Sequence, residues 1–399
     1  MTAGDIDRMA REEMPLRILH LCWEYPPRGS GIGRYLAEIS FGLRGRGHYS
    51  VVVTSRGDGL PEEEPLENGY IYRVYNRDEI GSERVAKLVL DLAAKNEVDL
   101  IEAPDHLGEA AELMKYPHRP PVMINCRYND ILLSARYSQV HYPWQRFTIW
   151  LACLRQYKVM RRERYSIENA DLLVAPSNKM MNGLREQGVK LPERTAVLAK
   201  PLTSLPDWKN AEAENPTVLF PARLDMGKGI AYLPDLLFAL RERFPDVVLE
   251  IAGEDTYARG IGSCKTWLEK RLQPVKKHVR FLGYLSNDEM NMAYRRAWVT
   301  LVLSKWDTSP TTILESMVRR KAIVSSPYGG MPEYLEGTDN VVCEPGSPEF
   351  ADAVATFLAD RNLREKAGSS GVQRANLEYA PNKCASAYID FVRESLRAV

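Results

Sequence analysis

The chain has 399 residues, of which 45% are hydrophobic and 27% are charged. Lys and Arg together number 53, and Asp and Glu also number 53, so the formal net charge is zero. At roughly 150 residues per domain, this length predicts two or three globular domains. The balanced charge argues against nucleic acid as a partner, because the chain as a whole is not attracted to phosphate backbones.

No apolar run reaches the roughly 18 residues that a membrane span needs. Residues 1–14 mix acids and bases without an apolar core, which predicts a frayed tail rather than a signal peptide. The six cysteines form no Cys-x-x-Cys pair and the six histidines form no His-x-x-x-His pair. We therefore expect reduced thiols, a cytoplasmic protein and no metal site built by the chain.

Strand-like and helix-like segments alternate in the first half of the chain. Residues 16–23 and 49–55 are apolar runs of strand length, and residues 33–48 between them carry Leu36 and Ile39 at helical spacing. The alternation continues with a helix at 83–97 and strands at 98–103, 121–126 and 170–177. Short β-branched runs between helices predict a doubly wound parallel sheet.

The same pattern restarts after residues 199–216, a segment rich in Pro and charge that is typical of a linker. A helix is expected at 229–244 and strands at 216–222, 247–253, 279–284, 297–304 and 321–326. We predict an α/β protein with two Rossmann-like domains facing a central cleft. The predicted boundaries are 1–205 for the first domain, 206–380 for the second and 381–399 for a C-terminal helix able to return to the first.

The loop 23–36 carries Gly29, Gly31 and Gly33 just before a helix. Backbone amides at a helix start favour an anion, so this loop is a candidate for approach to phosphates. Two alternatives stay open. Arg56 after the second strand would suit the 2′-phosphate of NADP, and the glycines would also suit a purely structural turn.

The loop 221–229 follows the first strand of the second half and offers Arg223 and Lys228. Two fixed cations at a helix start suit a diphosphate, because they neutralise charge that builds on a leaving group. The alternative is a solvated basic loop.

The segment 303–336 places two carboxylates, Asp307 and Glu315, around a predicted helix start after Pro310. One carboxylate then lies at the loop tip and the other further along the helix. This spacing suits a ligand with two hydroxyl-bearing parts, such as a sugar and a ribose. The alternative is an N-capping residue and a solvated Glu.

Taken in order, these segments resemble the retaining glycosyltransferases of family four, which have the GT-B fold. The resemblance rests on "YPPRGSGIGRYL", "GLRGRGH" and "ENADLLVAPS" in the first half, and on "ARLDMGKG", "IAGED", "VRFLGYLSNDEM", "LSKWDTSPTTILESM" and "YGGMPE" in the second. It covers most of the chain, and the order of the segments is more specific than any one of them.

The resemblance implies a role for each matching residue. Gly31 would place its amide by the donor phosphates, Arg223 and Lys228 would bind the diphosphate, and Glu315 would bind the ribose hydroxyls. Asp307 would face the transferred sugar, where the family usually has Glu. The amides of Thr311, Thr312 and Ile313 would also face the donor, and no metal would be needed.

The acceptor side is expected in the first half. Asp105 and His106 follow the strand at 98–103, with a satisfied surface histidine as the alternative reading of His106. Arg127 stands where the family often has a His, and Arg would bind a sugar hydroxyl or an anionic acceptor rather than act as a base. Residues 142–165 are aromatic and basic, which indicates either weak peripheral membrane contact or an ordinary packed helix.

The predicted function is a retaining, metal-independent hexosyltransferase without a cofactor. It would move a hexosyl group from a nucleoside-diphosphate sugar, expected to be UDP-linked, to a hydroxyl of an unidentified acceptor. The alternatives are a catalytically weak sugar-nucleotide-binding protein and an NADP-dependent oxidoreductase.

Overall fold

The computed structural model describes residues 14–27, 31–127, 129–132, 145–203, 205–258 and 260–397. Its contacts divide the chain into two units. Unit 1 holds the described residues up to Pro201 together with the helix near the C-terminus, and unit 2 holds those between Leu202 and Ala380. Both units are α/β with parallel sheets, as the sequence predicted.

Unit 1 is built on an eight-stranded sheet in the order β3-β4-β2-β1-β5-β6-β7-β8. All its pairings are parallel except that of β3 with β4, which form an antiparallel hairpin absent from the sequence prediction. The strands are β1 (Arg17–Leu21), β2 (Tyr49–Ser55), β3 (Glu63–Leu66), β4 (Gly69–Tyr75), β5 (Leu100–Pro104), β6 (Val122–Asn125), β7 (Leu172–Ala175) and β8 (Arg194–Val197). The α-helices are α2 (Gly31–Arg44), α3 (Glu83–Lys95), α5 (Gln145–Glu168), α6 (Asn178–Glu186) and α14 (Pro381–Arg397).

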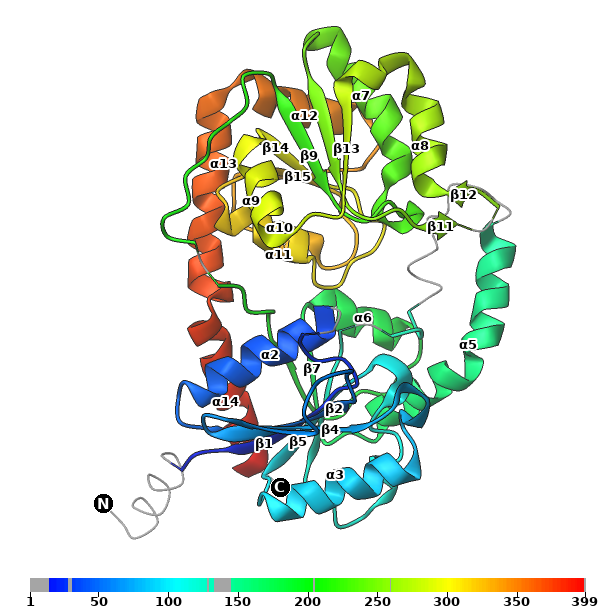
Figure 1. Cartoon of the computed structure of the whole chain (residues 1–399), viewed down its shortest axis with the longest axis vertical. Helices are drawn as coiled ribbons and strands as arrows, with labels where there is room; N and C mark the ends of the chain where they lie inside the picture. The colour runs from blue at the N-terminus through cyan, green and yellow to red at the C-terminus, as the bar shows by residue number, and fades with distance from the viewer. Residues whose placement is uncertain are drawn as a thin grey trace. The chain divides into compact units, whose positions relative to one another are not determined.

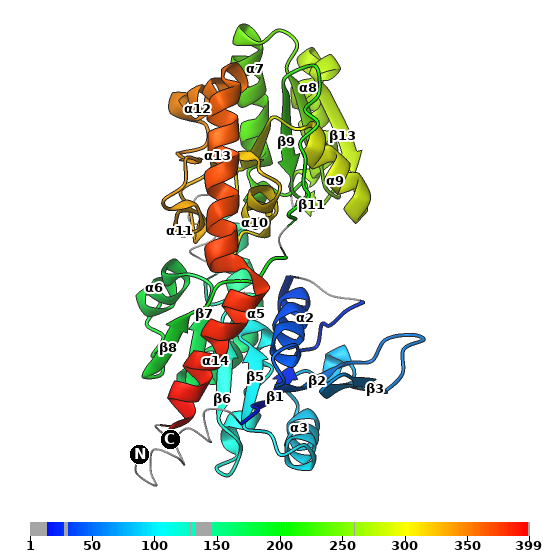
Figure 2. The same ribbon diagram turned by 90° about the vertical axis from the view of Figure 1, so that its left-hand side faces the viewer.

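Helix α14 lies against α2, although the two are far apart in the sequence (Figures 1 and 2). Helix α2 buries Leu36 and Ile39 at a spacing that keeps them on one helix face. On α14, Tyr388 and Val392 are fully buried and join the same core as Leu36, Leu100 on β5 and Val174 on β7. The C-terminal helix is therefore part of the hydrophobic core of unit 1.

Unit 2 is built on a six-stranded, wholly parallel sheet in the order β13-β10-β9-β14-β15-β16. These strands are β9 (Thr217–Pro221), β10 (Val248–Ala252), β13 (Val279–Gly283), β14 (Val299–Val302), β15 (Ala322–Ser325) and β16 (Val341–Val342); β11 (Tyr257–Ala258) and β12 (Gly262–Ser263) form a separate small hairpin. The α-helices are α7 (Leu233–Arg243), α8 (Cys264–Leu272), α9 (Asn287–Arg296), α10 (Thr311–Val318), α11 (Met331–Leu335), α12 (Pro348–Ala359) and α13 (Arg361–Arg374). Helices α12 and α13 contact each other (Figure 2), and both also contact β15.

The strand order of each sheet reverses direction at one point. In unit 2 the chain moves outward from β9 to β10 and β13, then returns to place β14 on the other side of β9. In unit 1 the corresponding neighbours are β1 and β5. Open α/β sheets bind ligands beyond the carboxyl ends of their strands at such points. We therefore expect a ligand site at the loops after β9 and β14 in unit 2, and at those after β1 and β5 in unit 1.

Candidate active site

The loop after β9 is held against the loop after β14. A short 3-10 turn, Met226–Lys228, begins at Asp225, whose side chain accepts a hydrogen bond from the Gly227 amide at 2.7 Å. The amide of Lys305 donates to the Gly227 carbonyl oxygen at 2.8 Å. Gly229 ends the turn at φ +82°, and a Cβ there would lie 2.1 Å from the Leu303 carbonyl oxygen, so only glycine allows this approach.

This approach brings Lys228 and Asp307 together, with Nζ of the lysine 2.8 Å from Oδ2 of the aspartate. Both side chains are partly exposed, at 31% and 22%. The other aspartate oxygen accepts from the Ser309 amide at 3.1 Å, which fixes the orientation of the carboxylate. Two residues that were singled out separately in the sequence thus form one charged pair.

A third loop supports Asp307 from behind. The amide of Gly330 donates to the Asp307 carbonyl oxygen at 2.8 Å. Gly329 has a φ of +64°, and a Cβ on it would lie 2.2 Å from the same carbonyl oxygen. The glycine pair of "YGGMPE" therefore lets the loop after β15 pack directly on the backbone of Asp307. The sequence pattern does not predict this contact of Gly329.

Arg223 lies two residues after the end of β9, and its side chain is exposed. Gly253 lies next to this backbone, since a Cβ on it would be 2.8 Å from the Arg223 amide nitrogen. Within the described part of the chain no ion pair to Arg223 is found. The exposed guanidinium of Arg223 thus shares the loop after β9 with Lys228, and Asp307 lies on the neighbouring loop after β14.

Helix α10 begins after Pro310, as expected, but one of the three amides predicted to face the donor is used differently. The Ile313 amide donates to the Pro310 carbonyl oxygen at 3.0 Å, so it is engaged within the helix start rather than directed at a ligand. Thr311 and Thr312 precede it as the first two residues of α10. The Thr312 hydroxyl donates to the carbonyl oxygen of Pro221, the last residue of β9.

Glu315 lies on the next turn of α10 beside Tyr294, whose hydroxyl donates to Glu315 Oε2 at 3.4 Å. Tyr294 is fully buried on α9. Burial, followed by the charge of Glu315, raises the pKa of the Tyr294 hydroxyl well above its usual value. Tyr294 therefore stays protonated and acts as a donor that orients the carboxylate. No sequence pattern had drawn attention to it.

In unit 1, Gly31 is the first residue of α2. A Cβ on Gly31 would meet nothing nearer than Nζ of Lys200, at 4.0 Å. Gly33 is different, because a Cβ there would lie 2.4 Å from the Glu24 carbonyl oxygen. Gly29 lies outside the described residues.

Asp105 and Arg127 lie just beyond the ends of β5 and β6, and both are buried. The Asp105 carboxylate accepts from the Arg127 amide at 2.9 Å and from the Asn129 side chain at 2.7 Å. The Arg127 guanidinium donates to Asn125 Oδ1 at 2.7 Å and to the Leu198 carbonyl oxygen at 3.2 Å. In this structure both groups tie loops of unit 1 together. His106, which is partly exposed, lies 3.9 Å from Glu163.

Comparison with known proteins identifies the family. The family model for glycosyl transferases of group 1 matches residues 206–374, and that for glycosyltransferase family 4 matches residues 29–199. Together they span most of the chain. The chain belongs to the group 1 glycosyltransferases. The alternative of an NADP-dependent oxidoreductase is therefore wrong.

Relatives of this glycosyltransferase agree with that assignment. A glycogen synthase of Mycobacterium tuberculosis is 24% identical over 393 residues, covering 91% of each chain. The structure of sucrose-phosphate synthase from Thermosynechococcus elongatus matches with a TM-score of 0.77 at 18% identity, over 96% of this chain and 100% of that one. Anabaena Alr3699/HepE in complex with UDP-glucose matches with a TM-score of 0.69 at 19% identity and the same coverage. The fold of this glycosyltransferase is GT-B.

The glycosyltransferase also carries buried polar groups that the sequence analysis did not select. Glu102 on β5 is fully buried and accepts from His20, from Asn125 and from the Tyr388 hydroxyl. The sequence signal for this cluster is a polar residue inside each of two apolar strands, His20 in 16–23 and Glu102 in 98–103.

Glu163 is a second buried carboxylate, and no comparable sequence pattern marks it. It accepts hydrogen bonds from the Leu107 and Asp130 amides. Its burial, together with the nearby charges of Asp105 and Asp130, raises its pKa to about 9.

Among the described residues of the glycosyltransferase, no three His, Cys, Asp or Glu side chains gather as metal ligands would. No helix in the same residues is both long enough and apolar enough to cross a membrane.

Proposed function

We propose that the chain transfers a hexosyl group from a UDP-linked sugar to a hydroxyl acceptor, with retention at the anomeric carbon and without a metal. The observation that carries this proposal is the Lys228–Asp307 pair, 2.8 Å apart, beyond the neighbouring strands β9 and β14. A cation beside a carboxylate offers one group for a diphosphate and one for a sugar hydroxyl. The start of α10 adds backbone donors on the same edge of the sheet.

Each part of the donor has a proposed partner in unit 2. Arg223 and Lys228 take the diphosphate, since a guanidinium and an ammonium can both stabilise the charge of a departing phosphate. Thr311 and Thr312 add helix-start amides. Glu315, oriented by Tyr294, accepts hydrogen bonds from the ribose hydroxyls. The uridine assignment is supported by HepE, whose structure contains UDP-glucose.

The proposed reaction breaks the bond between the anomeric carbon and the donor phosphate oxygen. The acceptor oxygen forms its new bond to the same face of that carbon, and its proton passes to the departing phosphate. No side chain has to act as the base in this scheme, which suits a site with two cations at the phosphates. Asp105 is the candidate base for an inverting reaction, but it is buried and already accepts two hydrogen bonds.

We also propose that unit 1 carries the acceptor side. Gly31 would approach the donor phosphates there, and Asp105, His106 and Arg127 lie beyond β5 and β6.

Weak membrane contact is predicted for residues 142–165, of which the first three lie outside the described chain. On α5, Trp150, Leu154 and Tyr157 are more than half exposed.

The test is transfer from UDP-hexoses, followed by NMR of the product with and without EDTA. We expect the anomeric proton coupling constant of the product to match that of the donor, and the chelator to leave the rate unchanged. An inverted product, or a rate lost with EDTA and restored by magnesium, would overturn the mechanism. Tight UDP binding without transfer or donor hydrolysis would favour the catalytically weak binding protein.

A further inference from the structure

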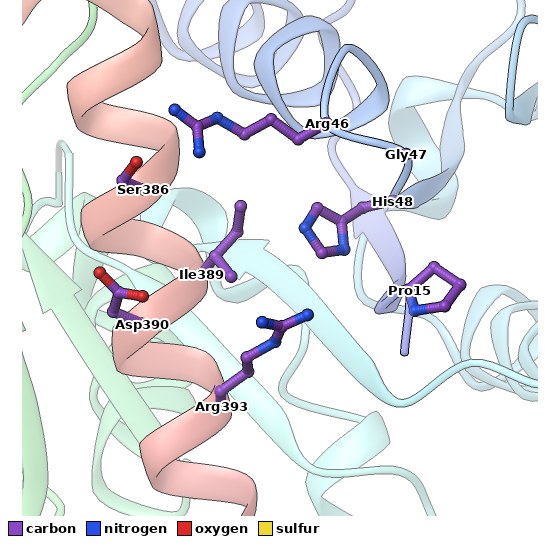
Figure 3. Close-up of a pocket in the computed structure, with 8 residues that line it drawn as sticks. All are labelled: Pro15, Arg46, Gly47, His48, Ser386, Ile389, Asp390 and Arg393. Carbon is purple, nitrogen blue, oxygen red and sulfur yellow. The ribbon is translucent and has the colours of Figure 1, made fainter. Parts of the chain in front are cut away.

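Unit 1 contains a pocket at the opposite edge of its sheet from the candidate acceptor residues. It lies where the chain enters β1 and β2, against α14 (Figure 3). Its volume is about 490 Å³, within the range of small-molecule sites. The lining residues are Pro15, Arg46, Gly47, His48, Ser386, Ile389, Asp390 and Arg393.

Two guanidinium groups enter this pocket from different elements. Arg46 comes from the turn between α2 and β2, and Arg393 comes from α14 (Figure 3). Each is held by one hydrogen bond to a backbone carbonyl oxygen: Arg46 to Asn382 at 2.8 Å, and Arg393 to Met14 at 3.0 Å. This hydrogen bond restricts the rotation of each guanidinium group, so less side-chain entropy is lost when a ligand binds.

The third donor is His48, which is 6% exposed. Its Nδ1 accepts a hydrogen bond from the Leu16 amide at 2.9 Å, so the ring proton resides on Nε2. Burial lowers the pKa of His48, and the nearby Arg393 and Arg46 lower it further. The imidazole is therefore neutral near pH 7, and both arginines lie close enough to act on it.

The acidic residue that lines the pocket does not neutralise its positive charge. Asp390 is exposed on α14, and none of the ion pairs found in the described chain involves it. Two arginines, one aspartate and a neutral histidine leave a net charge of +1 on the lining. Ser386 adds a hydroxyl, and Ile389 and Pro15 supply an apolar wall.

We propose that this pocket binds a phosphate group, either as orthophosphate or as the monoester of a small polyol. Arg46 and Arg393 pair with the phosphate oxygens, for which their planar forks are suited, and Nε2 of His48 donates to the same group. Asp390 is placed to accept from hydroxyls of a polyol. A bound phosphate bridges the α2–β2 turn to α14 and holds that helix on unit 1. This site is independent of the proposed transfer reaction.

The experiment titrates the full chain, labelled with ¹⁵N-histidine, with orthophosphate and separately with a hexose 6-phosphate at constant ionic strength. We expect a saturable shift of the His48 ring signals and a rise in its pKa, because a bound anion stabilises the imidazolium. His278, which lies in unit 2, reports non-specific salt effects. Tighter binding of the hexose phosphate identifies a monoester as the ligand, and equal binding identifies orthophosphate.

Matched variants separate this site from the donor site. Arg46→Gln and Arg393→Gln should each weaken the His48 response at least tenfold. Arg185→Gln, which removes another exposed guanidinium of unit 1, should leave it unchanged, as should Lys228→Ala. Circular dichroism checks that each variant is folded. The proposal fails if His48 and His278 shift together without saturation, or if the two pocket variants respond like Arg185→Gln.

Discussion

Lys228 and Asp307 form an ion pair across 79 positions of sequence, with 2.8 Å between Nζ and Oδ2. The pair holds the ammonium in place but also neutralises it until a donor binds. We expect Asp307→Asn to bind UDP several-fold more tightly, because Lys228 then meets the diphosphate without a competing carboxylate. Turnover should fall, because the proposed sugar contact is weakened. Calorimetric titration with UDP and a transfer assay measure both effects, and weaker UDP binding would contradict the first.

Arg223→Ala and Lys228→Ala should each reduce turnover about a hundredfold, since loss of one preorganised charge contact costs about 3 kcal/mol in the transition state. The loop that carries both residues is set by backbone contacts at Gly227, Gly229 and Gly253, so the fold should survive. Lys270→Ala, an exposed lysine on α8, serves as the control. Near-normal rates in both loop variants would remove these cations from the mechanism.

Glu315→Ala should weaken UDP binding, because each charge-assisted hydrogen bond to the ribose contributes about 1.5–3 kcal/mol. Tyr294→Phe should weaken it less, since it removes only the hydroxyl that orients the carboxylate. Calorimetric titration of both variants with UDP gives the two affinities, and uracil, which lacks the ribose and the diphosphate, serves as the ligand whose binding neither variant should change. Unchanged UDP affinity in Glu315→Ala would make this residue an ordinary helix-surface glutamate.

Asp105→Asn should lower stability rather than change the stereochemistry of the product. An amide group can accept only through its oxygen, so either the Arg127 amide or the Asn129 side chain loses its acceptor. A buried donor left unpaired costs about 1–3 kcal/mol. Thermal unfolding and the product's anomeric coupling constant are the measurements. If turnover vanished while the melting temperature stayed the same, Asp105 would be a base after all.

Lys321 gives a pH-dependent prediction. It is buried, its Nζ donates to the Ala297 carbonyl oxygen at 2.6 Å, and burial lowers its pKa to about 7. The unfolded chain, with a pKa of about 10.4, binds more protons between these values, so this group makes the unfolding free energy rise with pH there. The rise is at most about 1.4 kcal/mol per pH unit, and below pH 7 the cost of the buried ammonium is fully present.

Lys321→Met should remove that slope, and Lys270→Met should keep it. Glu163 contributes the opposite slope up to about pH 9, but it does so in all three proteins and cancels in the difference. Urea unfolding at pH 7 and pH 9 provides the comparison. Equal differences between wild type and Lys321→Met at the two pH values would show that the lysine titrates normally.

The sequence predicted the strands with the strongest apolar character best. Strand β2 spans Tyr49–Ser55, the predicted range, because "YSVVVTS" is β-branched and buried on both faces. Strand β3 was missed because Glu63–Leu66 contains two acids and a proline at a sheet edge, where side chains are half exposed. The Asn68-Gly69 turn, with Asn68 at φ +56°, was the signal for the hairpin.

For the candidate site, sequence order located the loops but not the contacts between them. The positions of Arg223, Lys228 and Asp307 after strands followed from the alternating pattern. Their meeting depends on which strands are neighbours, and on Gly229 and Gly329 allowing close approach. The sequence pattern also does not predict in which direction a side chain points. Asp105 follows a strand as predicted, yet its carboxylate lies within the protein because Arg127 and Asn129 provide donors there.

The return of α14 to unit 1 has a consequence for biosynthesis. Tyr388 supplies one of the partners of the buried Glu102 carboxylate, and Val392 fills the same core as Leu36. When a ribosome has made the chain only as far as Ala380, unit 2 has its whole sequence. Unit 1 still lacks α14, which forms one side of its hydrophobic core. The earlier-made unit is thus the later one to reach its final state, and a fragment ending at Pro201 would expose an apolar surface that invites aggregation.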